Sequence, residues 1–477
     1  MANSAYPVYD FQSYDSFSRL RVSQDQTVFE SKLLYDTEPL YWDHQMIDSN
    51  NVVITNQTGY NNSFTAPGTV NLTIAASASA PQPVKGVRQT YQRFGHQSGK
   101  SHLIFLSGIL EAGNALAATA TTRIGIFDDN DGIFIQASPN SGANAMEYSI
   151  VKRSSAVVET SVNSSIWYIN TGTSTDGALF SPTNIHTFYI SYNSTGSQDI
   201  TFGILVGGRL ITLYTFFNNY KNNSTTSQFV SPNLPIRYEV GVTAFNPSQI
   251  PSIICMGTSV VSEGGNELKG MTYMIDRNSS RLNISQINTI YPALICKLQS
   301  TSKSTNVFFD NLEILPSSQD ILYKWYIYAN PVISLTSAIL SNGALATNRL
   351  ITPGISYTYQ KNRIEYEYVP GNNSTVSSTV SVANNTLAGT VTTTSVITNT
   401  HVRYTDELLL NGGDVLLSGF SKGNATIDLR NTNASKYSLG FSINNIPNIL
   451  CIGIETINPV VAQSTDFNVA VIVRETM

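Results

Sequence analysis

The sequence predicts an all-β protein made of two antiparallel β-sandwich, jelly-roll-like domains. Charged residues make up only 12% of the 477 residues, while aromatic residues make up 10%, with 25 Tyr and 20 Phe. Short apolar runs alternate with turn signals such as Asn61-Asn62, Asp131-Gly132 and Gly207-Gly208. β-branched and aromatic side chains suit a pleated surface, and Asn and Gly close tight turns. No amphipathic run of helical length separates the strands, as a βαβ sheet would require.

The length of the chain favours two such domains, preceded by an arm. Residues 1–45 carry large aromatic and charged side chains without a periodic core, so we expect an extended N-terminal arm that lies against its own domain or a neighbour. The strand pattern weakens after Glu263 and then resumes. The expected domains are therefore residues 46–265 and residues 266–477.

The strand pattern carries two further signals, a repeated segment and a series of short apolar runs. Ile250–Gly257 and Ile446–Gly453 share an Ile-Pro-x-Ile-x-Cys-x-Gly pattern, which leaves a duplicated domain open as an alternative to chance recurrence. Apolar, β-branched composition predicts strands at many short segments. These include residues 102–110, 123–127, 133–136, 165–168, 186–192, 200–206, 307–314, 414–420, 425–429, 437–443 and 450–457.

Charge and cysteine usage exclude several classes of protein. The net charge of -5, from 27 basic and 32 acidic residues, argues against a nucleic-acid partner, which needs a surplus of Lys and Arg. Cys255, Cys296 and Cys451 lie far apart in apolar company and are expected to be buried hydrophobes rather than disulfide partners. No secretory signal pattern and no apolar window of about 18 residues occurs, so no membrane span is expected.

The segment Gly95–Ser101 resembles a phosphate-binding loop only superficially. Such a loop has four residues between its glycines and leads into a helix, whereas here three residues intervene and a strand-like run, Leu103–Leu106, follows. We therefore expect a turn that joins a strand pair, and no nucleotide cofactor.

The segment Asp128–Gly132 offers oxygen ligands that a hard cation would accept. It lacks the distal Glu of a calcium loop, and its flanks predict a β-hairpin closed by an Asp-Gly turn. We therefore expect a structural hairpin without a bound metal.

The residues around other catalytic patterns do not support a catalytic role. Gly419–Gly423 has the spacing of a nucleophile elbow, but a strand follows it and the last histidine, His401, precedes it, so a hairpin turn is expected. No zinc-ligand spacing occurs among the histidines and cysteines. Carboxylate pairs such as Asp406-Glu407 and Asp10 with Asp15 are weak glycosidase candidates, with surface charge as the alternative. We predict no catalytic residue, metal or cofactor.

Five blocks in order resemble a known family. They are Phe17–Ser23 with Thr27–Lys32, Arg88–Thr90 with Ser98–Ser101, Arg123–Asp128 with Asn130–Phe134, Pro235–Glu239, and Ser259–Gly265. Together they resemble a family of uncharacterised virion structural proteins of aquatic tailed phages and large DNA viruses. The resemblance spans residues 10 to 270 and continues loosely to Val469–Glu475; Ser18 departs from it, because Gly is expected there. It implies a location in the virion, after synthesis in the host cytoplasm, rather than a reaction.

The sequence therefore favours a non-enzymatic virion component, either a minor capsid or vertex protein or a tail or fibre subunit. Its expected partners are other virion proteins and further copies of itself. The first alternative is a receptor- or glycan-binding adhesin, whose partner would be a host surface glycan. Weaker alternatives are a virion-associated polysaccharide-degrading enzyme and a double jelly-roll major capsid protein. The candidate interface residues are Phe11, Phe17, Arg19, Arg21, Phe29, Trp42, Arg88, Arg93 and Lys100.

Overall fold

The computed structural model confirms the all-β, antiparallel sandwich prediction. Every strand pairing in the described part of the chain is antiparallel, and the one regular helical element there is a single 3-10 turn, Ser164–Ile166. The described residues are 25–33, 41–48, 60–66, 68–74, 83–94, 101–112, 120–140, 146–156, 158–168, 180–192, 199–217, 229–231, 233–243, 250–263, 270–277, 281–284, 290–302, 305–331, 333–339, 347–351, 359–367, 402–405, 414–430, 432, 437–457 and 465–476.

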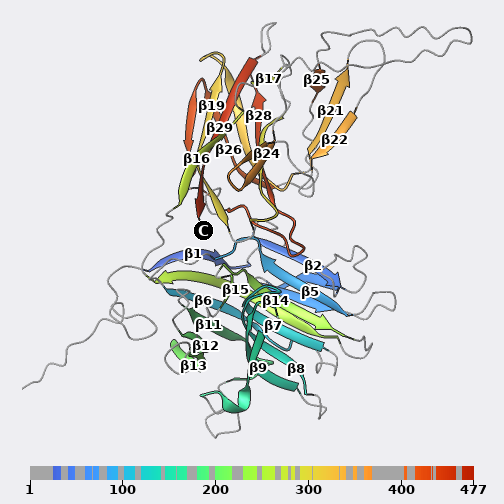
Figure 1. Cartoon of the computed structure of the whole chain (residues 1–477), viewed down its shortest axis with the longest axis vertical. Helices are drawn as coiled ribbons and strands as arrows, with labels where there is room; N and C mark the ends of the chain where they lie inside the picture. Colours follow the sequence, from blue (N-terminus) through green and yellow to red (C-terminus); the bar gives the residue numbers. More distant parts are fainter. Residues whose placement is uncertain are drawn as a thin grey trace, which may run out of the picture.

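The first sandwich consists of an eight-stranded and a seven-stranded sheet (Figure 1). The eight-stranded sheet has the order β13 (Arg209–Phe216), β12 (Ile200–Val206), β11 (His186–Tyr192), β6 (Ser101–Ile109), β15 (Ser252–Glu263), β4 (Thr69–Ile74) and β3 (Tyr60–Ala66), with β1 (Gln26–Ser31) also paired to β15. The seven-stranded sheet has the order β10 (Val158–Asn163), β9 (Met146–Ser154), β8 (Gly132–Pro139), β7 (Ala120–Phe127), β14 (Ile236–Val242), β5 (Val84–Thr90) and β2 (Trp42–Asp48).

The second sandwich has a five-stranded and a six-stranded sheet, with a separate three-stranded sheet beside them (Figure 1). The five-stranded sheet has β16 (Met271–Asp276), β29 (Thr465–Thr476), β19 (Asn306–Pro316) and β27 (Ala425–Asp428), with β17 (Leu282–Ile284) also on β29. The six-stranded sheet has β23 (Tyr359–Lys361), β24 (Ile364–Glu367), β18 (Tyr291–Leu298), β28 (Ile449–Thr456), β20 (Leu322–Ala329) and β26 (Asp414–Lys422). The third sheet has β22 (Thr347–Ile351), β21 (Ile333–Ile339) and β25 (Val402–Thr405).

The alternation of side chains along each strand separates the core from the outer faces. On β14, Tyr238 and Val240 belong to the core between the sheets, whereas Arg237 and Glu239 belong to the outer face of the seven-stranded sheet. Each sandwich has its own core cluster of buried apolar residues. Cys255, Cys296 and Cys451 are free and buried, which confirms their predicted role as hydrophobes.

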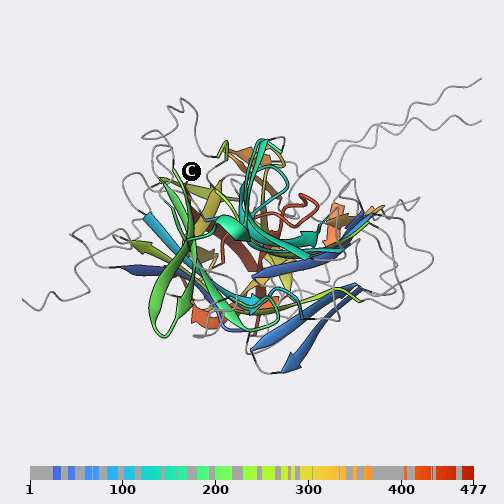
Figure 2. The same ribbon diagram turned by 90° about the horizontal axis from the view of Figure 1, so that it is seen from below.

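The two sandwiches follow one another along the longest axis of the molecule, and from below the second lies behind the first (Figures 1 and 2). The strands of one run at a large angle to those of the other (Figure 1). Within the described residues, the structure has no helix that is long and apolar enough to span a membrane.

The described part of the predicted arm is built into the first sandwich. Within residues 1–45, β1 pairs with the central strand β15, and β2 begins at Trp42 on the edge of the seven-stranded sheet. Phe29 and Trp42 are both buried in the core, where Phe29 also packs against Phe94. This segment therefore lies extended against its own domain.

Two predicted turns connect opposite sheets instead of neighbouring strands. The predicted hairpin turn at Gly419–Gly423 is wrong, because residues 419–422 belong to β26. β26 pairs with β20 and β27 pairs with β19, so the connection at Gly423-Asn424 crosses the second sandwich. β5 pairs with β14 and β2, whereas β6 pairs with β11 and β15, so these two strands are not a pair either. Residues 95–100 between them lie outside the described part. Alternating apolar residues define a strand but do not select its sheet, because both sheets offer the same core.

Two predicted strands are not strands in the structure. Residues 164–166 form the 3-10 turn because the Asn163 side chain accepts a hydrogen bond from the backbone N–H of Ser165, at 3.0 Å. Residues 437–443 form an irregular segment with isolated bridges, Val307 to Leu439 and Phe441 to Pro447. The predicted hairpin of β7 and β8 at Asp131-Gly132 is confirmed.

The two segments with the Ile-Pro-x-Ile-x-Cys-x-Gly pattern do not occupy equivalent positions. In β15, Ile253 and Cys255 belong to the core of the first sandwich. In β28, Leu450 and Ile452, which align with Ile254 and Met256, belong to the core of the second. The matched segments turn opposite faces inward, which counts against duplication.

Candidate functional site

A segment of the second sandwich, residues 437–449, docks on the outer face of the seven-stranded sheet. The backbone N–H of Ile443 donates to Asp43 Oδ2 at 2.7 Å, and the Ile443 side chain packs against Ile47 and Val87. Gly440 lies so close to the first sandwich that an added Cβ would meet the Tyr91 carbonyl oxygen at 2.2 Å. The docking is therefore a close contact between backbones.

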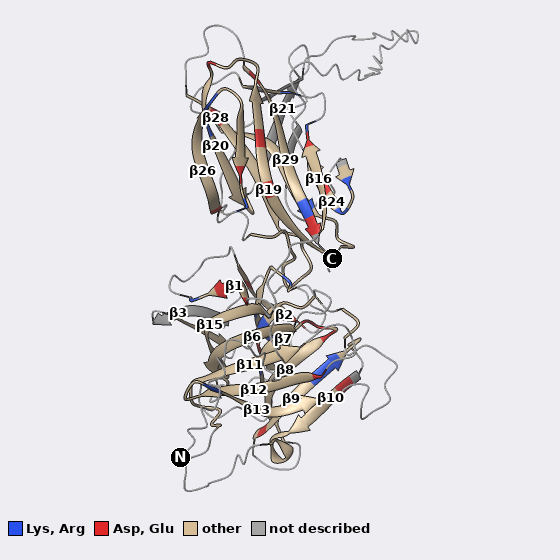
Figure 3. Cartoon of the chain, turned by 90° about the vertical axis from the view of Figure 1, so that its left-hand side faces the viewer, with Lys and Arg blue, Asp and Glu red and all other residues tan. Residues whose placement is uncertain are grey.

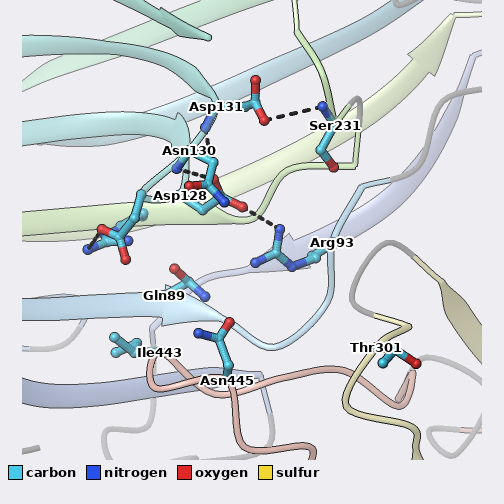
Figure 4. A pocket seen from close by; sticks show the side chains of 11 residues that line it. Gln89, Arg93, Asp128, Asn130, Asp131, Ser231, Thr301, Ile443 and Asn445 are labelled. Carbon is cyan, nitrogen blue, oxygen red and sulfur yellow. Dashed lines mark hydrogen bonds and ion pairs between the residues drawn. The ribbon is translucent and has the colours of Figure 1, made fainter. Parts of the chain in front are cut away.

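A polar pocket of about 340 Å³ opens beside this docking segment, between the two sandwiches (Figure 4). The first sandwich contributes the turn between β7 and β8, the outer face of β5 and β14, and the segment before β14. The second contributes Thr301 and the docking segment. The lining residues are Gln89, Arg93, Asp128, Asp129, Asn130, Asp131, Ser231, Arg237, Thr301, Ile443 and Asn445.

The carboxylates of the turn mostly bind the protein itself. Asp131 accepts from the backbone N–H groups of Ser155, Val230 and Ser231, at 3.2, 2.9 and 3.2 Å. Asp128 accepts from Arg93 at 2.7 Å and from two backbone N–H groups of its own turn. Burial opposes the ionisation of Asp128, but Arg93 and these hydrogen bonds outweigh it and lower its pKa. Both carboxylates thus hold the turn in place.

Amide side chains are the groups in the pocket that remain available. Gln89 is only 3% exposed, and its amide points into the pocket (Figure 4). Its register neighbours across the strands are Arg237 and Asp43. The exposed Asn445 faces Gln89 from the docking segment (Figure 4), and Asn130 lies on the β7–β8 turn. An amide offers both donors and an acceptor.

A network of ion pairs covers the outer face of the seven-stranded sheet next to the pocket. Glu239 binds Arg123 at 2.6 Å and Arg237 at 2.7 Å, and Arg237 also reaches Asp129 at 3.2 Å. Burial raises the pKa of Glu239, but the two guanidinium groups outweigh it and hold that pKa well below its ordinary value. Arg237 and Glu239 are 1% and 2% exposed. This network holds buried charge in compensated pairs.

Aromatic rings support the same network. Arg123 and Arg153 lie over the ring of Phe134 at 5.3 and 5.1 Å, and Arg237 lies over Phe127 at 5.3 Å. The two phenylalanine rings are 4.5 Å apart. These cation–π contacts hold the three guanidinium groups in position over the rings.

The outer face of the eight-stranded sheet lacks such a charged network along three of its strands. β6, β11 and β12 contain no Lys, Arg, Asp or Glu, whereas charges stand out on β9 and β10 (Figure 3). Hydroxyl groups bond to one another across the strands. The pairs are Ser107 with Thr187 at 2.9 Å, Tyr189 with Thr212 at 2.8 Å, and Thr201 with Thr215 at 3.2 Å. This face has no charged side chain on these three strands.

The predicted interface residues are distributed unevenly. Arg93 forms its ion pair at the pocket, and Arg88 is buried, with its guanidinium 5.0 Å from the centre of the Trp42 ring. Phe29 and Trp42 pack inside the first sandwich. The remaining predicted residues, Phe11, Phe17, Arg19, Arg21 and Lys100, and the carboxylates Asp10, Asp15, Asp406 and Glu407, lie outside the described residues.

The sequence did not indicate Gln89, Arg237 or Asn445 as pocket residues. Gln89 and Arg237 lie on the outer face of β5 and β14, and the residue pattern of a strand does not record what covers that face. Over the described residues, no three His, Cys, Asp or Glu side chains gather as metal ligands.

No protein-family model and no curated protein matches the chain. Solved structures that resemble part of it include an endo-1,3-beta-glucanase from Streptomyces sioyaensis, at 10% identity and TM-score 0.33, covering 50% of this chain and 97% of that one. A legume lectin-like domain from Entamoeba histolytica has 8% identity and TM-score 0.29, covering 49% and 96%. The CBM2 module of an evolved Dit from Lactobacillus casei BL23 phage J-1 has 8% identity and TM-score 0.30, covering 51% and 98%. Likenesses this weak carry no argument about the site.

Proposed function

We propose that the chain is a non-enzymatic structural subunit of a virion that acts through contacts with other proteins, including further copies of itself. The observation that best supports this is the outer face of β6, β11 and β12, three strands of the eight-stranded sheet that carry no charged side chain. The proposal also accounts for the five blocks that resemble virion structural proteins.

The physical argument rests on the cost of removing side chains from water. Burying a charge in an interface is expensive unless it is paired, whereas hydroxyl groups that already bond to one another lose less. Interface centres are accordingly depleted in charge. Leu205 and Leu210 lie directly opposite each other on this face and are 37% and 39% exposed, although both are large and apolar. They supply apolar surface for such a contact, at the hairpin end of β12 and the edge strand β13.

The test compares incorporation into particles. Mass spectrometry of purified virions is expected to find the chain, and the double change Leu205→Asp with Leu210→Asp is expected to lower its incorporation about tenfold or more, a loss of about 1.4 kcal/mol. Val415→Asp is the matched control, because Val415 is also an exposed apolar strand residue, at 52%, but lies on the second sandwich. Virions that lack the chain, or full incorporation of the double variant, would overturn the proposal.

The N-terminal candidates Phe11, Phe17, Arg19 and Arg21 belong to the same proposal. β1 and β2 are part of the first sandwich, so deleting residues 1–45 would remove core residues such as Phe29. Deleting residues 1–24 leaves both strands intact. This shorter deletion is expected to reduce incorporation while circular dichroism stays unchanged; undiminished incorporation would reject the arm as a contact.

A further inference from the structure

We propose that the pocket between the two sandwiches binds a neutral, polyhydroxylated ligand of the sugar class. This inference rests on the lining of the pocket and is independent of the virion role.

The first step is the state of Gln89. Its side chain is 97% removed from solvent, it points into the pocket, and it makes no hydrogen bond with any described residue (Figure 4). Its amide is not among the fully buried side-chain atoms that lack a partner, so its N–H and C=O groups reach the space of the pocket. Buried polar groups in folded proteins are nearly always hydrogen-bonded, so the partner of Gln89 is whatever enters the pocket, water or a ligand.

The second step is the chemistry of the other available groups. Asn130 and Asn445 bring two further amides, and Ser231 and Thr301 bring hydroxyls. Amides and hydroxyls both donate and accept hydrogen bonds. A sugar hydroxyl does the same, so a ring with several hydroxyls matches this lining better than a group that only accepts or only donates.

The third step is charge. The carboxylate of Asp128 is paired with Arg93, and that of Asp129 with Arg237 and Lys85. Asp131 is occupied by three backbone N–H groups. Two of the three carboxylates in the lining are thus paired with cations, and the third is held by backbone N–H groups. A neutral ligand therefore suits this lining better than a phosphate, which would compete with these carboxylates for the arginines, or a calcium ion, which would compete with the arginines and N–H groups for the carboxylates.

The fourth step is size and position. A cavity of about 340 Å³ falls within the usual range of small-molecule sites, roughly 300–1,000 Å³. Asn445 and Thr301 come from the second sandwich and Gln89 from the first, so a bound ligand touches both. Binding therefore also stabilises the docked arrangement, by linkage.

The test uses the full-length chain on a microarray of neutral glycans, followed by titration calorimetry with the best-binding free saccharide. Gln89→Met keeps the length of the side chain without its amide. Asn445→Gly removes the amide of an exposed residue and is compatible with its left-handed backbone, whose φ is 62°. Each is expected to weaken binding about tenfold or more. Gln319→Met is the matched control, because Gln319 is exposed on a turn of the second sandwich and is not part of the pocket.

Three results would overturn the inference. One is the absence of any binding on the array. Another is binding by Gln89→Met and Asn445→Gly that is as strong as binding by Gln319→Met. The third is a rise in melting temperature with inorganic phosphate or calcium chloride, dependent on Gln89, when no saccharide produces one. Tight, Gln89-dependent saccharide binding supports the inference even if virions lack the chain.

Discussion

Glu239 lies between two guanidinium groups on the outer face of the seven-stranded sheet, with almost no access to solvent. Replacing one partner of a buried pair leaves the others uncompensated. We expect Glu239→Gln to lower the free energy of unfolding by about 3–5 kcal/mol at pH 7. The exposed pair of Lys32 with Glu30 provides the control, because Glu30→Gln should cost at most about 1 kcal/mol.

Acid should remove the difference in unfolding free energy between wild type and Glu239→Gln. The pKa of Glu239 is lowered in the folded protein, so its contribution to stability is present above the ordinary value of 4.5 and is lost as the pH falls below it. Urea unfolding at a series of pH values measures the effect. A gap between wild type and Glu239→Gln that stays constant down to pH 3 would contradict the assigned role.

Asp43 presents the opposite case at the docking contact. Burial raises its pKa, although hydrogen bonds from Ile443 and Gln45 act against the rise. The folded state thus favours the protonated carboxyl: its stabilisation is greatest below the ordinary value of 3.8 and is lost as the pH rises through the folded pKa. The ionised carboxylate is therefore a cost at neutral pH.

Asn at this position retains an acceptor for the Ile443 N–H and removes the charge. We expect Asp43→Asn to be as stable as wild type or more stable at pH 7, with a smaller dependence on pH. Asp43→Ala leaves the N–H without its acceptor and should cost about 1–3 kcal/mol. Melting temperatures from pH 3 to 8 distinguish the two, and equal destabilisation by both changes would contradict the argument.

The docking segment is the element on which the contact between the sandwiches depends. Its Gly440 leaves no space for a side chain against the Tyr91 carbonyl. We expect Gly440→Ala to push the segment away and separate the two sandwiches, visible as a larger radius of gyration in small-angle X-ray scattering. Gly257→Ala is the control, since its Cβ would make an ordinary contact of 3.6 Å with the Ser31 carbonyl oxygen. An unchanged radius for Gly440→Ala would show that the segment adapts.

At the scale of the whole molecule, the first sandwich separates two kinds of surface. The seven-stranded sheet carries the charged network, the pocket and the second sandwich, whereas the strands β6, β11 and β12 of the other sheet are free of charge. The outer face of the seven-stranded sheet thus makes contacts within the chain. The outer face of β6, β11 and β12 is the surface that we propose for contacts with other molecules.

The sequence by itself determined the class of fold. Its β-branched and aromatic runs, its Asp-Gly turn and its dispersed cysteines are local signals, and strands form wherever alternation offers one face to a core. It also excluded the phosphate-loop and elbow readings, because both require a helix that the following residues do not form. The buried cysteines and the hairpin of β7 and β8 agree with those signals.

Only the tertiary structure decided which strands share a sheet and what covers each outer face. Residues 437–443 have the composition of a strand, but they pair only at isolated bridges, Leu439 with Val307 and Phe441 with Pro447. The backbone N–H of Ile443 donates instead to Asp43, which lies 400 positions earlier in the chain. Gln89 and Asn445 line one pocket because the docking segment of the second sandwich packs against the first. Contacts between distant segments depend on the packing of whole sheets, and no local pattern records that packing.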